Sequence, residues 1–217
     1  MSRKIQNVIL LVDTSGSMDG KPIESVKKAI KNLSNKIDNF NSLSYRIEFK
    51  IISFATEAKY ISKNQIDNIC AYGRTNLADA YRKLELIFKS GRTFDFAPIV
   101  MLLCDGRPNL CNHEAALAEL EKKESFQKSF KFAFAYGEQD ASTMWTLKSF
   151  TRNKENIFYD NNIATVSNIL QYSLPKIIKR QAISDNNKYH ALTKMLKEDV
   201  LKYKKLGGQN NAIRRNF

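Results

Sequence analysis

The chain has 217 residues, enough for one large domain and a short appendage but not for two sizeable cores. With 43% hydrophobic and 26% charged residues the composition is that of a soluble globular protein, and only 8 Gly and 4 Pro argue against low-complexity linkers. The net charge of +13 permits nucleic acid or acidic proteins as partners and does not choose between them.

Cysteine usage and hydropathy predict the cellular location. Three Cys, an odd number without C-x-x-C spacing, argue against a disulfide framework and favour a reducing cytoplasm. The first apolar stretch breaks at Asp13 without a cleavage site, so no signal peptide is predicted. The longest apolar run, residues 99–104, is far shorter than the roughly 18 residues of a membrane span. We therefore expect a cytoplasmic protein without membrane contact.

The first half of the chain begins with a buried strand over residues 5–12, where an unbroken apolar run rich in β-branched side chains stops at Asp13. Apolar residues spaced by three and four predict a helix over 21–40, with Pro22 in its first turn. Alternation predicts a strand over 45–54. A short edge strand over 57–61 and a short helical turn over 65–70 follow.

The second half alternates in the same way. The loop 71–76 opens a helix capped by Thr75 or Asn76, which is expected to stop near Gly91. A fully apolar strand over 98–104 ends on Asp105, and a turn over 106–109 follows. A helix over 114–126 and a strand over 130–136 come next, and the aromatic side chains of this strand are predicted to lie in the core. A helix over 143–150 follows, whose Trp145 is predicted to pack on the sheet. The last elements are a strand over 157–159 and a closing helix over 163–180 that Pro175 kinks or breaks.

Strands that alternate with helices predict an α/β fold with a doubly wound, mostly parallel sheet of about six strands and helices on both faces. We place this domain at residues 1–180. Residues 181–217 form a basic extension with an amphipathic helix over 189–206, ended by the run 207–211, and a loose tail. The extension docks either on the domain or on a partner.

Polar side chains stand where the predicted strands end. Asp13 and Asp105 each follow a buried strand, Ser15 and Ser17 lie in the turn after Asp13, and Thr75 precedes a helix. In open parallel sheets, ligands bind at the carboxyl ends of the strands, where the strand order reverses. Carboxylate and hydroxyl oxygens suit Mg²⁺ or Mn²⁺ better than zinc or a nucleotide. The sequence therefore predicts a site for a hard divalent cation.

The order Asp13-x-Ser15-x-Ser17, then Thr75, then Asp105 resembles the von Willebrand factor A (vWA) domain and its metal-ion-dependent adhesion site (MIDAS), over roughly residues 5–180. Among relatives, bacterial tellurium-resistance TerY-like proteins look most similar. The resemblance implies a Rossmann-like sheet with one antiparallel edge strand. It implies Ser15, Ser17 and Thr75 as direct ligands of Mg²⁺, with Mn²⁺ or Ca²⁺ as substitutes, and Asp13 and Asp105 acting through waters or alternating with conformation.

The same resemblance implies a function. An open coordination position would accept an Asp or Glu from a partner protein, so the chain would be a non-catalytic binding module, in a bacterial intracellular stress-response or defence complex. Two other functions stay open. A phosphoryl-transfer enzyme of haloacid-dehalogenase type also binds Mg²⁺ at strand-end aspartates, but it needs a carboxylate where Ser15 stands. The basic tail permits nucleic-acid binding, although no recognition motif is present.

Four of the five site residues also have a purely structural interpretation. Asp13, Ser15 and Thr75 are all suitable helix caps, and Asp105 is a suitable turn residue. Asp79, one helical turn after Thr75, is either a neighbour of the ligands or merely solvated. His113 and His190 lack partners at zinc spacing and are expected to be ordinary surface residues.

Overall fold

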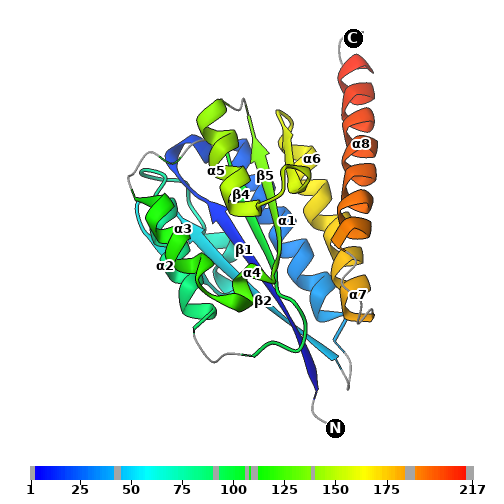
Figure 1. The fold of residues 1–217 in the computed structure, drawn as a ribbon. Helices are drawn as coiled ribbons and strands as arrows, with labels where there is room; N and C mark the ends of the chain where they lie inside the picture. Colours follow the sequence, from blue (N-terminus) through cyan, green and yellow to red (C-terminus); the bar gives the residue numbers. More distant parts are fainter. Residues whose placement is uncertain are drawn as a thin grey trace.

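The computed structural model describes residues 3–41, 45–89, 93–105, 108, 112–137, 140–183 and 189–213, apart from the side chains of 173, 179–183, 189–190 and 206–213. Six strands form one sheet in the order β3-β2-β1-β4-β5-β6 (Figure 1). They are β1 Lys4–Asp13, β2 Tyr45–Phe54, β3 Ala58–Ile61, β4 Ile99–Cys104, β5 Phe130–Tyr136 and β6 Ile157–Asp160. Only the edge strand β3 runs antiparallel among them, so the predicted doubly wound α/β fold is confirmed.

Helices cover both faces of this sheet (Figure 1). One face carries α1, α6, α7 and α8, and the other carries α2, α3, α4 and α5. Their bounds are α1 Lys21–Asp38, α2 Leu77–Ile87, α3 His113–Glu121, α4 Glu124–Gln127, α5 Ala141–Thr151, α6 Ile163–Asn168, α7 Leu174–Ile183 and α8 Tyr189–Ile213. Short 3₁₀ helices are η1 Gly16–Met18, η2 Lys63–Asn68 and η3 Lys154–Asn156, and η4 Ile169–Ser173 is a π-helix.

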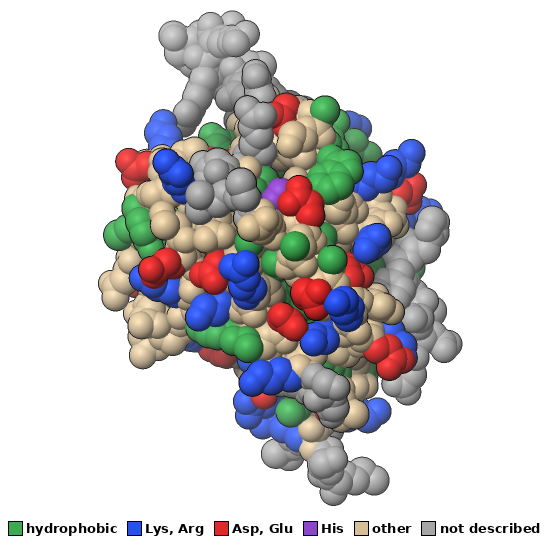
Figure 2. Space-filling view, turned by 60° about the vertical axis from the view of Figure 1, so that its left-hand side comes forward, with side chains coloured by type: hydrophobic (Ala, Val, Ile, Leu, Met, Phe, Trp, Pro, Cys, Tyr) green, Lys and Arg blue, Asp and Glu red, His purple; other side chains and the backbone are tan. Residues whose placement is uncertain are grey.

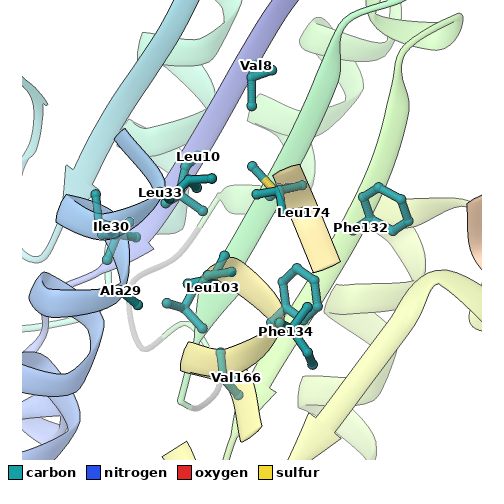
Figure 3. Packing of buried hydrophobic residues seen from close by; sticks show 14 of the residues in the cluster. Val8, Leu10, Ala29, Ile30, Leu33, Leu103, Phe132, Phe134, Val166 and Leu174 are labelled. Atoms are coloured by element: carbon teal, nitrogen blue, oxygen red, sulfur yellow. The ribbon is translucent and has the colours of Figure 1, made fainter. Parts of the chain in front are cut away.

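The sheet separates two hydrophobic cores because alternate side chains of each strand point to opposite faces. In β1, Val8 and Leu10 enter the first core, under α1 and α6–α8, whereas Ile9 and Leu11 enter the second, under α2, α3 and α5. Figure 3 shows strand residues of the first core, such as Leu103, meeting side chains from α1, α6 and α7. Burying one such side chain contributes roughly 1.5–3 kcal/mol to stability, so a strand apolar on both faces can only be central.

Two predicted elements differ from the structure because of local hydrogen bonds. The helix predicted over 114–126 is divided into α3 and α4. The amides of Lys122 and Lys123 bond to the carbonyls three residues earlier, and the side chain of Gln127 donates to the carbonyl of Glu121 at 2.7 Å. These bonds satisfy the carbonyl groups at the end of α3, and Phe126 of α4 turns into the second core.

The closing helix is interrupted as Pro175 predicts. Pro175 has no N–H to give to the carbonyl of Gln171, one turn earlier. That carbonyl accepts a 2.7 Å hydrogen bond from the Nζ of Lys36 on α1. Asn32, also on α1, donates to the Oε1 of Gln171 at 3.0 Å. The π-helix η4 therefore lies where α1 supplies the donors that the helix itself lacks.

The prediction that Trp145 packs on the sheet is wrong. Its side chain is 52% exposed, because α5 turns Leu147 and Phe150 to the second core instead. The expectation for His113 also fails, since this residue begins α3 and its side chain is only 13% exposed. Burial lowers its pKa below the usual value, although the carboxylate of Glu114, 3.3 Å away, opposes the shift. The buried aromatic face of β5 is confirmed.

The extension packs on the domain through α8. Leu192, Leu196 and Val200 enter the first core beside α6 and α7. The predicted end of this helix at 207–211 is wrong, because α8 continues to Ile213. Residue 180, the predicted domain boundary, lies within α7. The division of the chain into 1–180 and 181–217 stays a prediction.

Several expectations fall outside the described residues, namely those for Gly91, the positions 106 and 109 of the turn after Asp105, Cys111 and the tail 214–217. Cys104 is buried and Cys70 exposed, and neither forms a disulfide among the described residues. Within the part of the chain that the structure describes, no helix is long and apolar enough to cross a membrane.

Candidate metal centre

The strand order reverses between β1 and β4, and both strands end on a carboxylate. The chain leaves β1 to form β2 on one side, and it later returns to form β4 on the other side. Val12 at the end of β1 pairs with Leu103 of β4, so Asp13 and Asp105 lie at the same edge of the sheet. This is the position at which open α/β sheets bind their ligands.

The carboxyl group of Asp13 is held inside the protein, and Asp105 is half-buried. Asp13 is fully buried; its Oδ1 accepts a 2.8 Å hydrogen bond from the amide of Ser15. Burial raises its pKa from 3.8 to about 7; the bonds from Ser15 oppose that shift, and the charge of Asp105 adds to it. Burial also raises the pKa of Asp105, against a hydrogen bond from Ser17.

One oxygen of each carboxyl group lacks a hydrogen-bond partner among the described residues. These atoms are Oδ2 of Asp13 and Oδ1 of Asp105, and both are buried. An unpartnered buried carboxylate oxygen is costly, since burying a charge without compensation opposes folding. A cation at this edge would supply the missing interaction for both oxygens.

The turn after β1 brings two hydroxyl groups to the carboxylates. Ser15 directly precedes the short helix η1, and its Oγ lies 3.1 Å from the Oγ of Ser17. Ser15 is 2% exposed, whereas Ser17 is on the solvent side. Ser17 lowers the pKa of Asp105, and the charge of Asp105 raises the pKa of Asp13, so the oxygens at the ends of β1 and β4 act on one another.

The loop that carries Thr75 is bound to the same turn. Tyr72 donates its amide to the carbonyl of Thr14 at 2.9 Å, and Gly16 donates to the carbonyl of Gly73 at 3.1 Å. Thr75 itself is buried, with 5% of its surface exposed. It is not the cap of α2, because that position belongs to Asn76. The structure thus places Asp13, Ser15, Ser17 and Asp105 together and ties the loop of Thr75 to them.

Sequence reasoning missed Thr56, which supports this loop from the β2–β3 turn. Its Oγ1 accepts the amide of Arg74 at 3.2 Å, and its carbonyl accepts the side-chain amide of Asn76 at 2.9 Å. Gly73 has a φ of +67°, and a Cβ there would lie 2.3 Å from the Oγ1 of Thr56. The glycine in this loop indicates in the sequence that another group approaches the backbone closely, but it does not identify that group as the side chain of Thr56.

Asp79 has a structural role. Its Oδ2 accepts the amide of Ala58 at 2.7 Å and so fixes the start of β3. Among the described residues there is no group of three or more His, Cys, Asp or Glu side chains that would suit a metal bound by them alone. The candidate centre is instead a set of two carboxylates and hydroxyl oxygens. This donor set fits a hard cation such as Mg²⁺ or Mn²⁺.

Comparison with known proteins gives one family and one fold. The family model for the von Willebrand factor type A domain matches residues 7–172. Inter-alpha-trypsin inhibitor heavy chain H4 of Sus scrofa is 28% identical over 116 residues, which are 48% of this chain. The chain spans only 13% of that relative's length.

Solved structures agree in fold at low identity. Proximal thread matrix protein 1 of the mussel byssus, with a zinc-occupied MIDAS motif, has a TM-score of 0.62 at 18% identity, covering 82% of this chain and 48% of that one. The von Willebrand factor domain of the pilus tip protein Mfa5 from Porphyromonas gingivalis has a TM-score of 0.67 at 10% identity, covering 87% and 99%.

Proposed function

Because this chain belongs to the von Willebrand factor type A domain family, we propose that it is a protein-interaction module that works through a divalent cation. Domains of this family are commonly metal-dependent interaction modules. Asp13, Ser15, Ser17, Thr75 and Asp105 would hold the ion. The observation that carries the proposal is the pair of buried carboxylate oxygens, one on Asp13 and one on Asp105, that have no partner among the described residues.

Mg²⁺ is the ion we propose, with Mn²⁺ or Ca²⁺ as alternatives. Mg²⁺ prefers oxygen ligands and retains part of its water shell, so it needs few protein carboxylates. Hydroxyl ligands such as Ser15 and Ser17 are neutral and leave much of the charge of the ion uncompensated. The zinc in the mussel protein supports the view that a MIDAS motif accepts more than one divalent ion.

We propose that the ion binds an Asp or Glu side chain of a partner protein and that no reaction follows. Ser15 stands where a phosphoryl-transfer enzyme of haloacid-dehalogenase type would need its second carboxylate. On the face over α2 and α3, Lys and Arg alternate with Asp and Glu and form no continuous basic area among the coloured residues (Figure 2). This face therefore gives no support to nucleic-acid binding, and a cytoplasmic bacterial stress-response or defence complex remains our proposed setting.

The decisive experiment compares Asp13→Asn with Asp67→Asn. The first variant keeps an oxygen that can accept from Ser15 but removes the charge, whereas Asp67 lies exposed on η2, where it forms an ion pair with Lys31 of α1. Calorimetric titration with Mg²⁺ should show binding by the wild type and Asp67→Asn only. Capture of a partner from lysate should follow the same pattern and disappear in EDTA. Capture that persists in EDTA and in Asp13→Asn would refute the proposal, and Mg²⁺-dependent hydrolysis of p-nitrophenyl phosphate would favour the enzyme.

A further inference from the structure

A second candidate site lies at the opposite end of the sheet. A cavity of about 530 Å³ is formed where β5 begins, between the ends of α3 and α5 and the first turns of α8. Cys104 pairs with Ala135 near the end of β5, so the metal edge lies about 20 Å away along the strand. The volume is in the range of small-molecule sites, roughly 300–1,000 Å³.

A buried lysine lines this cavity. Lys131 lies in β5, and its side chain is only 5% exposed. Its Nζ is 3.2 Å from the Oε1 of Glu121 and 4.1 Å from the centre of the Phe126 ring. The alternating aromatic residues of β5 concealed this position in the sequence, because Lys131 occupies the face that otherwise carries Ala133 and Ala135.

The cavity wall has more cationic groups and donors than carboxylates. Arg152, which directly follows α5, places its Nε 3.5 Å from the same Oε1 of Glu121. Glu121 is the single carboxylate among the described residues of the wall, and it faces two cations. The Oδ1 of Asn156 accepts a 2.7 Å bond from Thr193, which leaves the amide hydrogens of Asn156 as further donors.

We propose that this cavity binds a small molecule through an oxyanion group, either carboxylate or phosphate. The guanidinium group of Arg152 offers the planar pair of donors that such groups accept. The ammonium of Lys131 adds charge in a place where water screens it poorly. Burying a lysine is costly unless it is paired, and one shared carboxylate leaves the two cations only partly compensated.

The occupant would also touch α8, because Thr193 forms part of the wall. Thr193 is buried and joins α8 to η3 through Asn156. A molecule bound here strengthens the contact between the extension and the domain. This inference is independent of the metal centre.

The test uses the full chain with inorganic phosphate and citrate as probes, each against chloride at equal ionic strength. Arg152→Gln leaves the Lys131–Glu121 pair in place, and its side chain is 65% exposed, so the variant should fold. We expect calorimetric titration to show at least tenfold weaker binding by Arg152→Gln. Lys122→Gln, which removes an exposed cation next to α3, should bind like the wild type.

Hydrogen exchange tests the link to α8. The probe that binds should slow exchange of the α8 amides in the wild type and not in Thr193→Val. Equal binding by the wild type and Arg152→Gln, or no binding beyond chloride, would overturn the site. Binding without slower exchange would overturn the link. Binding of phosphate alone or citrate alone would identify the ligand as a phosphate ester or a carboxylic acid.

Discussion

Replacing Asp13 by Asn should make the metal-free protein more stable at alkaline pH while it destroys the metal centre. Burial raises the pKa of Asp13 from 3.8 to about 7, so the folded protein binds a proton more tightly than the unfolded chain. An acid shifted in this direction makes the fold less stable as the pH rises from about 4 to 7. Above that range the full cost of the buried charge remains.

The magnitude follows from the pKa values. Each pKa unit corresponds to about 1.4 kcal/mol, so the ionised Asp13 costs the metal-free fold about 4 kcal/mol at pH 8 and less than half of this at pH 5. Asn carries no charge, but its buried amide lacks a partner and costs about 1–3 kcal/mol at every pH. The difference in unfolding free energy between Asp13→Asn and the wild type should therefore grow by about 2–3 kcal/mol from pH 5 to pH 8.

Urea unfolding in EDTA at pH 5 and pH 8 measures this difference directly. Mg²⁺ should then stabilise the wild type at pH 8, where Asp13 is ionised, and leave Asp13→Asn unchanged. Asp67→Asn, on the surface, serves as the control for loss of one carboxylate. A difference that stays constant with pH would show that Asp13 does not carry a buried charge in the metal-free fold, and it would remove the electrostatic basis of the proposed centre.

Three further predictions concern glycines in loops, the packing of α5 and the π-helix η4. Gly73→Ala forces a Cβ against a threonine hydroxyl and should weaken Mg²⁺ binding in titration. Gly20→Ala, with a φ of +76° and nothing within 4 Å of the new Cβ, should cost about 1–3 kcal/mol of backbone strain in urea unfolding and keep the metal. Trp145→Ala should change stability by no more than about 0.5 kcal/mol, and Phe150→Ala should cost about 3–5 kcal/mol by the same measurement. Lys36→Met removes the donor to the carbonyl of Gln171 in η4. The variant should lose about 1–3 kcal/mol of stability, which a lower midpoint of thermal unfolding would report.

The sequence allowed the metal centre to be predicted because its residues stand at the ends of strands. Val8 to Val12 and the run before Asp105 are apolar throughout, which places both strands in the middle of a parallel sheet. The carboxyl ends of such strands necessarily meet at one edge. The positions of Asp13 and Asp105 in the fold could therefore be inferred from the residues at which the two apolar runs end.

Other features depend on contacts between distant segments. Thr56 lies in a turn, where no periodicity marks a residue that accepts a bond from the next loop. Lys131 is stable inside the protein only because Glu121 and Phe126 surround it, and neither is its neighbour in the strand. The hydrophobicity of Trp145 gives no information on which side of α5 faces the sheet, and the break between α3 and α4 depends on the bond from Gln127.

The packing of α8 on the first core has a practical consequence. Leu192, Leu196 and Val200 seal apolar side chains of α6 and α7 from water. A recombinant fragment that ends at residue 180 would expose this apolar surface. We expect such a fragment to aggregate or to bind amphipathic peptides nonspecifically. Interaction screens with such a fragment would then yield nonspecific binders, so the protein used in a screen should retain α8.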